Sequence, residues 1–403
     1  MTQFPLPSAV TEAIETLEAA GYEAYAVGGC VRDLCRGTVP HDYDITTSAT
    51  PEECEACFAG RRIIETGIKH GTVTVIVDGE PLEITTYRTD GEYLDGRHPE
   101  SVTFSRRIED DLSRRDFTVN AMAYSPSRGL VDLFGGREHL RAGVIACVGE
   151  PDKRFGEDGL RIMRALRFAS TFGFRIEAET AESIHKNRAL LSNISAERIL
   201  AEYRRLIVGV GAVDILTEYE DVMCAVMPEL EGHDEYVRAV GAIADSRDDV
   251  NLRTALLLRS CDNIAALRRL KPDGKMKDSV SRVLALVGEG FETDRVSLRR
   301  ILRLCPYDDV HRAVEVACAT GRISPDAAAT TADMLSRMEN AGECVTVRQL
   351  RVTGRDLISL GVTEGERIGA ILDELLESVI TDRISNDREA LLDMVCNIVG
   401  RDS

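Results

Sequence analysis

Two different hydrophobic patterns follow each other along the chain. Up to about residue 140, apolar residues occur in short alternating stretches rich in β-branched side chains, as at residues 25–27, 72–77 and 82–87, which is typical of strands. From about residue 152 onward, apolar positions recur at helical spacing, as in EDGLRIMRALRFA, AERILAEYRRLI and ERIGAILDELLESVI. The pattern therefore predicts an α+β fold, with a mixed β-sheet in an N-terminal head and helices in the rest of the chain.

A tight hairpin is predicted between residues 72–77 and 82–87. Asp78 and Gly79 lie between these two stretches, and both flanks are rich in β-branched residues. An Asp-Gly pair suits a two-residue hairpin turn because both residues tolerate the backbone angles that such a turn requires. The two strands are therefore expected to be neighbours in the sheet.

We expect four domains. The strand pattern fades near residue 143, and the sequences VGVGA near 208 and NAGECVT near 340 interrupt the helical pattern. These breaks predict a head at 1–143, a helical neck at 144–208, a helical body at 209–340 and a helical tail at 341–403. A chain of 403 residues is long enough to form more than one buried core.

The composition predicts a soluble, cytoplasmic protein without a membrane partner. No apolar run approaches the roughly 20 residues needed to cross a bilayer. The first residues, MTQFPLPSAVTEAIETLEAAG, have neither a basic leader nor a small-residue cleavage site. The 11 cysteines are odd in number and scattered, which is typical of reduced thiols in a cytosol. The sequence does not indicate an oligomeric state.

The charge distribution is uneven. A net charge of -19 is unusual for a protein that binds nucleic acid, because phosphate binding normally relies on a positive field. Residues 263–303, however, carry ten Lys and Arg against five acids. This cluster, with Lys271, Lys275 and Lys277 among its lysines, is a candidate surface for an RNA backbone. The alternative is an ordinary solvated helix face.

A glycine-rich turn is the first candidate site. In AYAVGGCVRD, Gly28 and Gly29 follow a predicted strand and precede a helical turn that carries Arg32. Glycines at this position let backbone N–H groups approach a phosphate closely, and the arginine adds a positive charge. A plain turn would have the same glycines. The spacing matches neither the dinucleotide-binding nor the P-loop pattern.

Paired carboxylates follow about ten residues later. In HDYDITT, Asp42 and Asp44 are two residues apart and would project from one face of a strand. Adjacent carboxylates repel unless a cation lies between them, so the pair predicts magnesium binding for phosphoryl-transfer chemistry. Glu83, on a neighbouring predicted strand, is a candidate third catalytic acid. The alternatives are a surface turn at the pair and a solvent-facing side chain at Glu83.

The order of four motifs resembles a known family. The chain contains, in this order, GGxVRD, DxD, RRDFTVNAMA at 114–123 and EDGLRIMRALRF at 157–168. Together these motifs resemble the superfamily of class II CCA-adding enzymes (tRNA nucleotidyltransferases) and bacterial poly(A) polymerases. The resemblance covers roughly residues 20–205. It implies a phosphate loop at Gly28, Gly29 and Arg32, metal carboxylates at Asp42 and Asp44, and nucleotide contacts from Arg115 and Asp116, with Asn120 close by.

The EDxxR segment can also be interpreted chemically. On a helix, Asp158 and Arg161 would share a face, and Arg164 and Arg167 would continue a basic stripe. An aspartate accepts from an exocyclic amine and an arginine donates to an unprotonated ring nitrogen, which fits cytosine and adenine but not uracil or guanine. An ordinary ion pair between Asp158 and Arg161 is the alternative. The resemblance implies nucleotide contacts for Arg164 and Arg167.

The resemblance implies template-independent addition of the 3′-terminal CCA to tRNA, from CTP and ATP with Mg²⁺ and with release of pyrophosphate. Residues 88–104 resemble the complete flexible loop of enzymes that can add the terminal A. An enzyme that adds only A, a bacterial poly(A) polymerase and an inactive tRNA-binding protein remain alternatives. The basic cluster, with Lys271, Lys275 and Lys277, and the tail are expected to contact tRNA.

Overall fold

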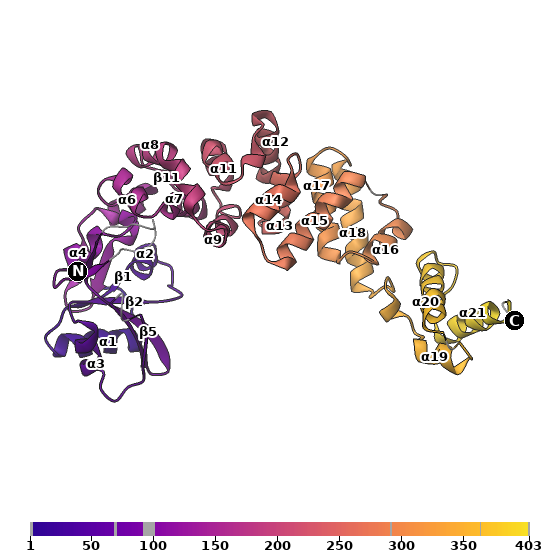
Figure 1. Cartoon of the computed structure of the whole chain (residues 1–403), viewed down its shortest axis with the longest axis horizontal. Coiled ribbons are helices and arrows are strands. Elements are labelled where there is room, and N and C mark those ends of the chain that lie inside the picture. The colour runs from indigo at the N-terminus through magenta and orange to yellow at the C-terminus, as the bar shows by residue number, and fades with distance from the viewer. Residues whose placement is uncertain (1–2, 68–70, 92–100, 291, 363, 402–403) are drawn as a thin grey trace. The chain divides into compact units, whose positions relative to one another are not determined.

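The computed structural model describes residues 3–67, 71–91, 101–290, 292–362 and 364–401 (Figure 1). The chain forms two compact units. The first consists of residues 1–231 together with 269–271, and the second consists of residues 232–268 and 272–403. The predicted domain boundaries near 143 and 208 lie inside the first unit and the one near 340 lies inside the second, and they stay predictions.

The first unit begins with a seven-stranded mixed sheet of order β3-β4-β5-β2-β1-β8-β9. Strands β2 and β5 run parallel, whereas the other neighbouring pairs are antiparallel. The strands are β1 (Ala24–Val27), β2 (Asp44–Thr47), β3 (Ile63–Gly67), β4 (Thr72–Val77), β5 (Glu80–Thr86), β8 (Met122–Ser125) and β9 (Gly129–Asp132). A separate pair, β6 (Arg88–Asp90) and β7 (Val102–Phe104), is antiparallel. The predicted mixed-sheet head is confirmed.

The predicted hairpin between β4 and β5 is confirmed. Asp78 and Gly79 form the turn with φ angles of 50° and 88°. Positive φ at both central residues belongs to the tight turn whose twist matches that of the flanking strands. Val75 therefore pairs with Leu82, and Thr74 pairs with Glu83.

Helices pack on both faces of the sheet. Ala26, Ile45 and Ile84 contribute to a core on one face that also includes buried residues of α1 (Ser8–Ala19) and α3 (Pro51–Cys57). The opposite face carries a smaller cluster that includes Val27 and residues of α4 (Ile108–Ser113). Helices α2 (Gly29–Cys35) and α5 (Gly136–Ala142) and the short 3₁₀ helix η2 (Thr118–Asn120) complete this part of the unit. Because strand side chains alternate between faces, consecutive residues of a strand pack in the apolar clusters on opposite faces of the sheet.

The rest of the first unit is mainly helical. Its helices are α6 (Pro151–Glu157), α7 (Leu160–Phe172), α8 (Ala178–Asn187), α9 (Ala196–Leu206), α10 (Ala212–Glu218) and α11 (Glu220–Val226). The expectation of an all-helical neck needs one correction, because β10 (Val144–Ile145) and β11 (Arg175–Ile176) form a short parallel pair. Residues 175–176 follow Gly173, which ends α7 with a positive φ of 67° and lets the chain turn back.

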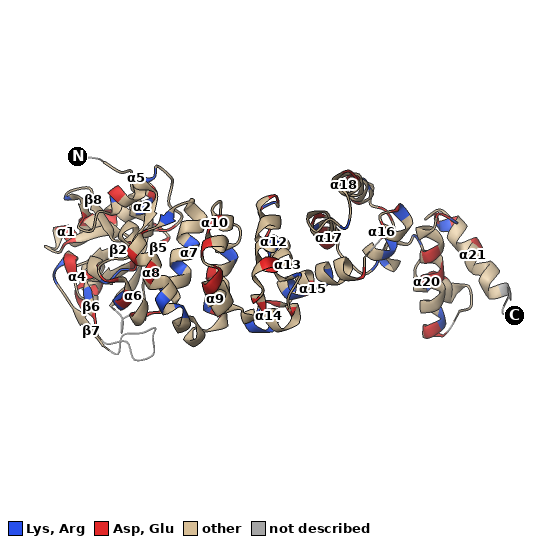
Figure 2. Cartoon of the chain, turned by 90° about the horizontal axis from the view of Figure 1, so that it is seen from above, with Lys and Arg blue, Asp and Glu red and all other residues tan. Residues whose placement is uncertain are grey.

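The second unit is helical throughout its described residues. It contains two apolar clusters, one that includes Leu298 and Val314 and one that includes Leu375 and Leu391. Its helices are α12 (His233–Ala244), α13 (Val250–Leu258), most of α14 (Asn263–Leu270), α15 (Gly274–Glu289), α16 (Arg295–Leu302), α17 (Tyr307–Ala319), α18 (Pro325–Asn340), α19 (Gly354–Ser359), α20 (Gly365–Ile380) and α21 (Arg388–Arg401). Acidic and basic residues are interspersed along these helices (Figure 2). Among the described residues, no helix is long and apolar enough to cross a bilayer.

Candidate active site

Two of the predicted catalytic acids are direct neighbours in the sheet. Asp44 at the start of β2 pairs in register with Glu83 on β5, and Val27 on β1 pairs with Asp44 from the other side. Register partners point to the same face of a sheet, so the two carboxylates share a face. Asp42 lies two residues before Asp44, and all three acids are exposed. Glu83 therefore points to solvent, as the alternation allows, and not into a buried sheet interior.

Desolvation and the negative charge of the neighbouring acids raise the pKa of Asp44. The pKa of its carboxyl is raised, first because surrounding protein atoms desolvate it and second because of the negative charge of Glu83. The nearby Arg115 opposes this rise. Asp44 as a whole residue is exposed, so the desolvation acts on its carboxylate while part of the side chain still reaches solvent. A cation would relieve the repulsion between these acids.

The donor set fits a divalent cation that keeps part of its own hydration. Carboxylate oxygens are the ligands that Mg²⁺ prefers, and Mg²⁺ usually binds through one or two carboxylates together with water and substrate phosphates. Among the described residues, no group of three or more His, Cys, Asp and Glu side chains is arranged to hold a metal ion. Asp42 and Asp44 would therefore be an open site and not a closed protein cage.

The glycine turn lies directly beside Arg115. Gly28 has a φ of 79°, and its N–H donates to the carbonyl of Met122 at 3.1 Å. A Cβ atom at Gly28 would lie 2.9 Å from Nη1 of Arg115. The backbone angle requires glycine, and a larger residue would also displace the guanidinium of Arg115. Gly29 begins α2 and lies next to the guanidinium of Arg32, at 3.7 Å from its would-be Cβ to Nη2.

A chain of hydrogen bonds connects the glycine turn to α7. Nη1 of Arg32 donates to Oδ1 of Asn120 at 2.8 Å, and Nδ2 of Asn120 donates to Oδ1 of Asp116 at 3.1 Å. The other oxygen of Asp116 accepts from Nε and Nη2 of Arg164 at 2.9 and 2.6 Å. Four predicted nucleotide-binding residues are therefore in one connected network.

Electrostatics stabilise the buried end of this network. Burial would raise the pKa of Asp116, but the charge of Arg164 and the hydrogen bonds from Arg164 and Asn120 outweigh it and lower that pKa to about 2. The same ion pair raises the pKa of Arg164. Arg115 is held separately, because its Nη2 donates to the buried Asp111 at 3.1 Å. Nε of Arg115 is buried and has no hydrogen-bond partner in the described part of the chain.

Asp158 and Arg161 lie differently from the prediction. Asp158 is not in the helix: α6 ends at Glu157, α7 begins at Leu160, and Asp158 has extended backbone angles of -148° and 105°. Its Oδ1 accepts the N–H of Leu160, the first residue of α7, at 3.0 Å. The expected shared face of one continuous helix is wrong, because Asp158 lies in the break between α6 and α7 and belongs to neither helix.

The two residues also have different charge partners. Oδ2 of Asp158 accepts from Nη2 of Arg198 on α9 at 2.6 Å. Nη1 of Arg161 donates to Oε2 of Glu157 at 2.6 Å. The alternative interpretation is an ion pair between Asp158 and Arg161. The described structure does not contain this ion pair. Each of the two side chains is oriented by a third residue.

Arg164 and Arg167 meet at one acid. Nε of Arg167 lies 2.8 Å from Oε2 of Glu202 on α9, and Nη1 of Arg164 lies 3.8 Å from Oε1 of the same residue. Arg167 is buried, and this burial lowers its pKa while Glu202 opposes the change. The predicted basic stripe is therefore anchored to α9 and is not a freely solvated surface.

Comparisons with known proteins agree with this arrangement. A family model described as the poly A polymerase head domain matches residues 24–146, and one described as tRNA nucleotidyltransferase domain 2 matches residues 254–395. A protein of Lactiplantibacillus plantarum named CCA-adding enzyme is 34% identical over 409 residues, which cover 98% of this chain and 97% of the relative. The chain belongs to the CCA-adding enzyme family. It is accordingly a tRNA nucleotidyltransferase that uses a divalent metal ion.

Other relatives of this family support the assignment. The CCA-adding enzyme of Geobacillus stearothermophilus is 35% identical over 387 residues, with 94% of each chain covered. The crystal structure of the Bacillus stearothermophilus CCA-adding enzyme in complex with CTP has a TM-score of 0.79 and 32% identity, and the match covers 98% of this chain and 97% of that one. The Thermotoga maritima CCA-adding enzyme complexed with tRNA, at 20% identity and a TM-score of 0.68, shares the fold.

Several residues of this CCA-adding enzyme site were not predicted from the sequence. Glu157 orients Arg161, Arg198 orients Asp158 and Glu202 holds Arg164 and Arg167. Two of these residues come from α9, about 40 positions further along the chain. The segment AERILAEYRRLI contains both, but a charged helix of this kind gives no local sign of which partner it meets.

In the described part of the chain, only some of the basic side chains in the predicted RNA surface are free of an acidic partner close enough to neutralise them. Lys271, Lys275 and Lys277 are exposed, and Nζ of Lys271 lies 4.0 Å from Oε1 of Glu197. Most of the other bases between residues 263 and 303 form ion pairs: Arg269 with Glu229, Arg282 with Asp309, Arg295 and Arg299 with Glu343, Arg300 with Glu377 and Arg303 with Asp373. Local acids therefore neutralise much of the positive charge that the sequence count suggested.

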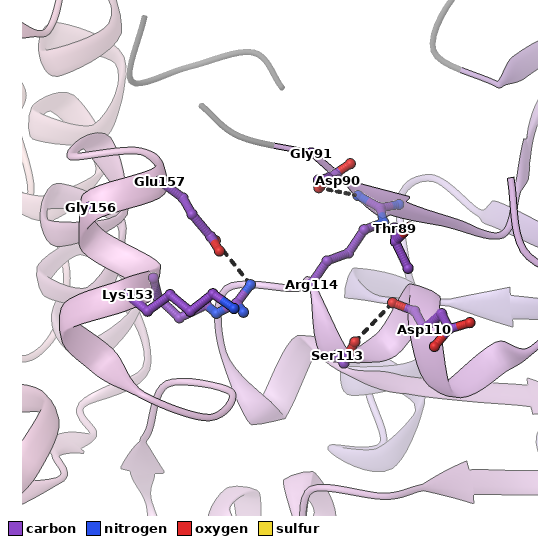
Figure 3. A pocket seen from close by; sticks show the side chains of 10 residues that line it. Thr89, Asp90, Gly91, Asp110, Ser113, Arg114, Lys153, Gly156 and Glu157 are labelled. Carbon is purple, nitrogen blue, oxygen red and sulfur yellow. Dashed lines mark hydrogen bonds and ion pairs between the residues drawn. The ribbon is translucent and has the colours of Figure 1, made fainter. Parts of the chain in front are cut away.

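A cavity of about 730 Å³ is lined in part by Glu157, the hydrogen-bond partner of Arg161. Lys153 and Glu157 extend into it from α6, and Arg114 and Asp90 lie on the other side (Figure 3). Of the predicted flexible loop at 88–104, residues 92–100 lie outside the described residues.

Proposed function

We propose that this enzyme extends the 3′ end of tRNA by C, C and A from CTP and ATP, with two Mg²⁺ ions held by Asp42 and Asp44. The observation that carries the assignment of the catalytic residues is the shared sheet face of Asp44 and Glu83, with the Gly28 turn and Arg115 beside it. When bound, the ions would activate the terminal hydroxyl and neutralise the departing pyrophosphate. Glu83 is proposed as an additional acid of this site.

The proposed reaction is a simple substitution at phosphorus. A bond forms between the 3′ oxygen of the tRNA and the α-phosphorus of the nucleotide, and the bond from that phosphorus to the pyrophosphate breaks. Arg32 and Arg115 are proposed to bind the triphosphate, since both guanidinium groups lie at the glycine turn. Positioned positive groups at the phosphates stabilise the charge that develops during the transfer.

Base selection is proposed for Asp158 and Arg161. The oxygens of Asp158 already accept from Leu160 and Arg198, but a carboxylate has further lone pairs that can accept from the exocyclic amine of cytosine or adenine. Arg161 uses Nη1 for Glu157 and the carbonyl of Arg154. Its Nη2 donates to the carbonyl of Arg114, so it has a second hydrogen left for the ring nitrogen of the base.

The remaining assignments follow from the same proposal. The head at 1–143 would carry catalysis and the neck at 144–208 base recognition, while the body and tail would bind tRNA, with Lys271, Lys275 and Lys277 contributing. A cytoplasmic location is also proposed, because all eleven cysteines are free thiols, which suits a reducing compartment.

One experiment tests the function as a whole. The purified protein is incubated with tRNA ending at the discriminator base, at C and at CC, with each labelled nucleoside triphosphate in turn and with Mg²⁺, Mn²⁺ or a chelator. We expect two C additions followed by one A, which stop in the chelator. Addition of A only to the CC end would instead indicate an A-adding enzyme, and long A tails would indicate a poly(A) polymerase. No addition by the parent protein would reject the proposal.

A further inference from the structure

Three arginines of the site surround one aromatic ring. The guanidinium carbon of Arg167 lies 3.5 Å from the centre of the Phe168 ring, that of Arg32 lies 5.3 Å away and that of Arg164 lies 5.5 Å away. All three distances are within the range in which a cation is attracted to an aromatic ring. Arg32 comes from α2 beside the glycine turn, whereas the other two come from α7.

Three like charges around one point repel each other, and the described structure compensates this in two ways. Each arginine has its own acidic partner: Asp33 for Arg32, Asp116 for Arg164 and Glu202 for Arg167. The ring of Phe168, within 5.5 Å of all three guanidinium carbons, is a second source of attraction. The negative charge density over an aromatic ring attracts cations without supplying a further ionised group.

Other aromatic side chains hold the ring in place. Phe168 is buried, with 4% exposure. Its ring meets that of Phe117 edge to face at 5.8 Å and stacks on that of Phe172 at 5.7 Å. Phe117 directly follows Asp116 and donates its N–H to that carboxylate at 2.8 Å. The ring is therefore fixed against the same segment that holds Arg164.

Phe172 differs in which arginines it contacts. The guanidinium carbons of Arg32 and Arg36, the latter at the end of α2, lie 5.0 and 4.2 Å from the centre of its ring. Phe172 therefore supports only the glycine-turn side of the site, whereas Phe168 contacts both that side and the arginines of α7. Phe174 stands 5.5 Å from Phe172 and completes the row.

We propose that Phe168 is a positioning residue that holds Arg32 and Arg164 in one geometry, and thereby joins the triphosphate side of the site to its base-reading side. The proposal rests on the function proposed above. Phe168 lies too deep to be a contact for the nucleotide itself, so its effect acts through the arginines. Weakening the ring's attraction for cations, at constant size, should weaken binding of CTP and ATP alike.

A fluorination series tests the proposal in the full-length enzyme. Phe168 is replaced by 4-fluoro-, 3,5-difluoro- and 3,4,5-trifluorophenylalanine, which weaken the ring's attraction for cations with little change in volume. We expect KM for CTP and for ATP to rise stepwise with fluorination, by about three- to tenfold at the trifluoro step, with kcat changed less. The same series at Phe174, for which the described structure contains no arginine contact, is the matched control and should leave KM unchanged.

Two outcomes separate this proposal from the function itself. The positioning role is supported if KM rises with each added fluorine at residue 168 and stays constant across the same series at residue 174. Equal KM values across the Phe168 series, in an enzyme that still adds C, C and A, overturn the role while leaving the function intact. Phe168→Leu provides a second measurement: it keeps an apolar side chain, so a rise in KM without a loss of melting temperature agrees with the proposal, and an unchanged KM contradicts it.

Discussion

Asp44 and Glu83 are register partners on the parallel strands β2 and β5, and both side chains are exposed on the same sheet face. The pairing places a carboxylate from each strand beside the other, and Glu83 raises the pKa of Asp44 through its charge. Repulsion of this kind has no structural benefit for the sheet, since like charges directly opposite each other destabilise it. This repulsion supports the proposal that a cation binds at these acids.

The first prediction separates these acids by their contribution to catalysis. Asp42→Asn and Asp44→Asn should abolish both C and A addition while leaving tRNA binding within a few-fold, because the carboxylates serve the chemistry. Glu83→Gln should lower the rate by at least roughly tenfold, about 1.4 kcal/mol of barrier. Glu80→Gln, on the same strand and also exposed, is the matched control and should keep the parent rate. An unchanged rate in Glu83→Gln would remove Glu83 from the site.

The second prediction concerns the pH dependence of stability at the buried pair of Asp116 and Arg164. The folded pKa of Asp116 is about 2, below its ordinary value of 3.8. A lowered folded pKa means that the stabilisation is present above the unfolded value and is lost as the pH falls through the folded value. The difference of the two values corresponds to roughly 2 kcal/mol, lost between pH about 4 and about 2.

Hydrogen exchange of the α7 amides can measure this effect. Protection in the parent should fall as the pH decreases from about 4 to about 2, and it should fall less in Asp116→Asn, which cannot ionise there. Asp33→Asn, a change at a partly exposed acid of the same network, serves as control and should retain the parent's pH dependence. Parallel curves for the parent and Asp116→Asn would contradict the assigned pKa.

Much of the head could be predicted because its signals are local. Asp78 and Gly79 have the residue types that their turn requires, and the strands on either side were expected where they occur. The pairing of Asp44 with Glu83 is different. Nearly 40 residues separate the two positions, and alternation along each strand says which face a side chain takes but not which strand lies next to it.

The neck shows a second limit of prediction. Its helical periodicity continues through Asp158 and Gly159, although the structure breaks the helix there. Asp158 accepts the N–H of Leu160, and a Cβ at Gly159 would lie 3.0 Å from Cβ of Leu190. That close approach is a tertiary contact which periodicity cannot reveal. For the same reason, Arg198 and Glu202 could not be predicted as partners of the site arginines and aspartate.

A third prediction concerns stability in the second unit. Asp309 is buried and accepts from Nε of Arg282 at 2.7 Å and from Nη1 of Arg312 at 3.0 Å. Asp309→Ala should destabilise the unit by about 3 to 5 kcal/mol, because it leaves two arginines without this partner. Asp308→Ala, an exposed neighbour on the same helix, should cost less than about 1 kcal/mol. Melting temperature and hydrogen exchange in α15 and α17 would show the difference.

The fourth prediction tests the RNA surface. Replacing Lys271, Lys275 and Lys277 together by Ala should weaken tRNA binding and make it less dependent on salt, because fewer phosphates are neutralised. The slope of log affinity against log salt should become shallower by about one unit for each phosphate that no longer meets a lysine. Lys186→Ala is the control, because that exposed lysine already pairs with Asp152. Affinity for CTP should not change. Binding curves with the same slope in the parent and the triple variant would exclude these lysines from the RNA surface.

The two residues proposed to read the base, Asp158 and Arg161, have different charge partners. Arg198 pairs with Asp158, and Glu157 pairs with Arg161. The two side chains can therefore be removed separately without leaving the other unpaired. This separation makes it possible to test the two halves of base recognition one at a time.

The last prediction uses this separation to test base choice. Asp158→Ala removes the acceptor for the exocyclic amine, while Arg161 can still donate to the carbonyl of uracil or guanine. Each lost or unmatched hydrogen bond is worth roughly 1 to 3 kcal/mol, so the preference for CTP over UTP should shrink by about one to two orders of magnitude. Arg161→Ala should instead weaken CTP and ATP together. Arg205→Ala, an exposed arginine on α9, is the control and should leave all four relative rates unchanged. Equal losses for all four nucleotides in Asp158→Ala would mean that this residue shapes the helix junction and does not read the base.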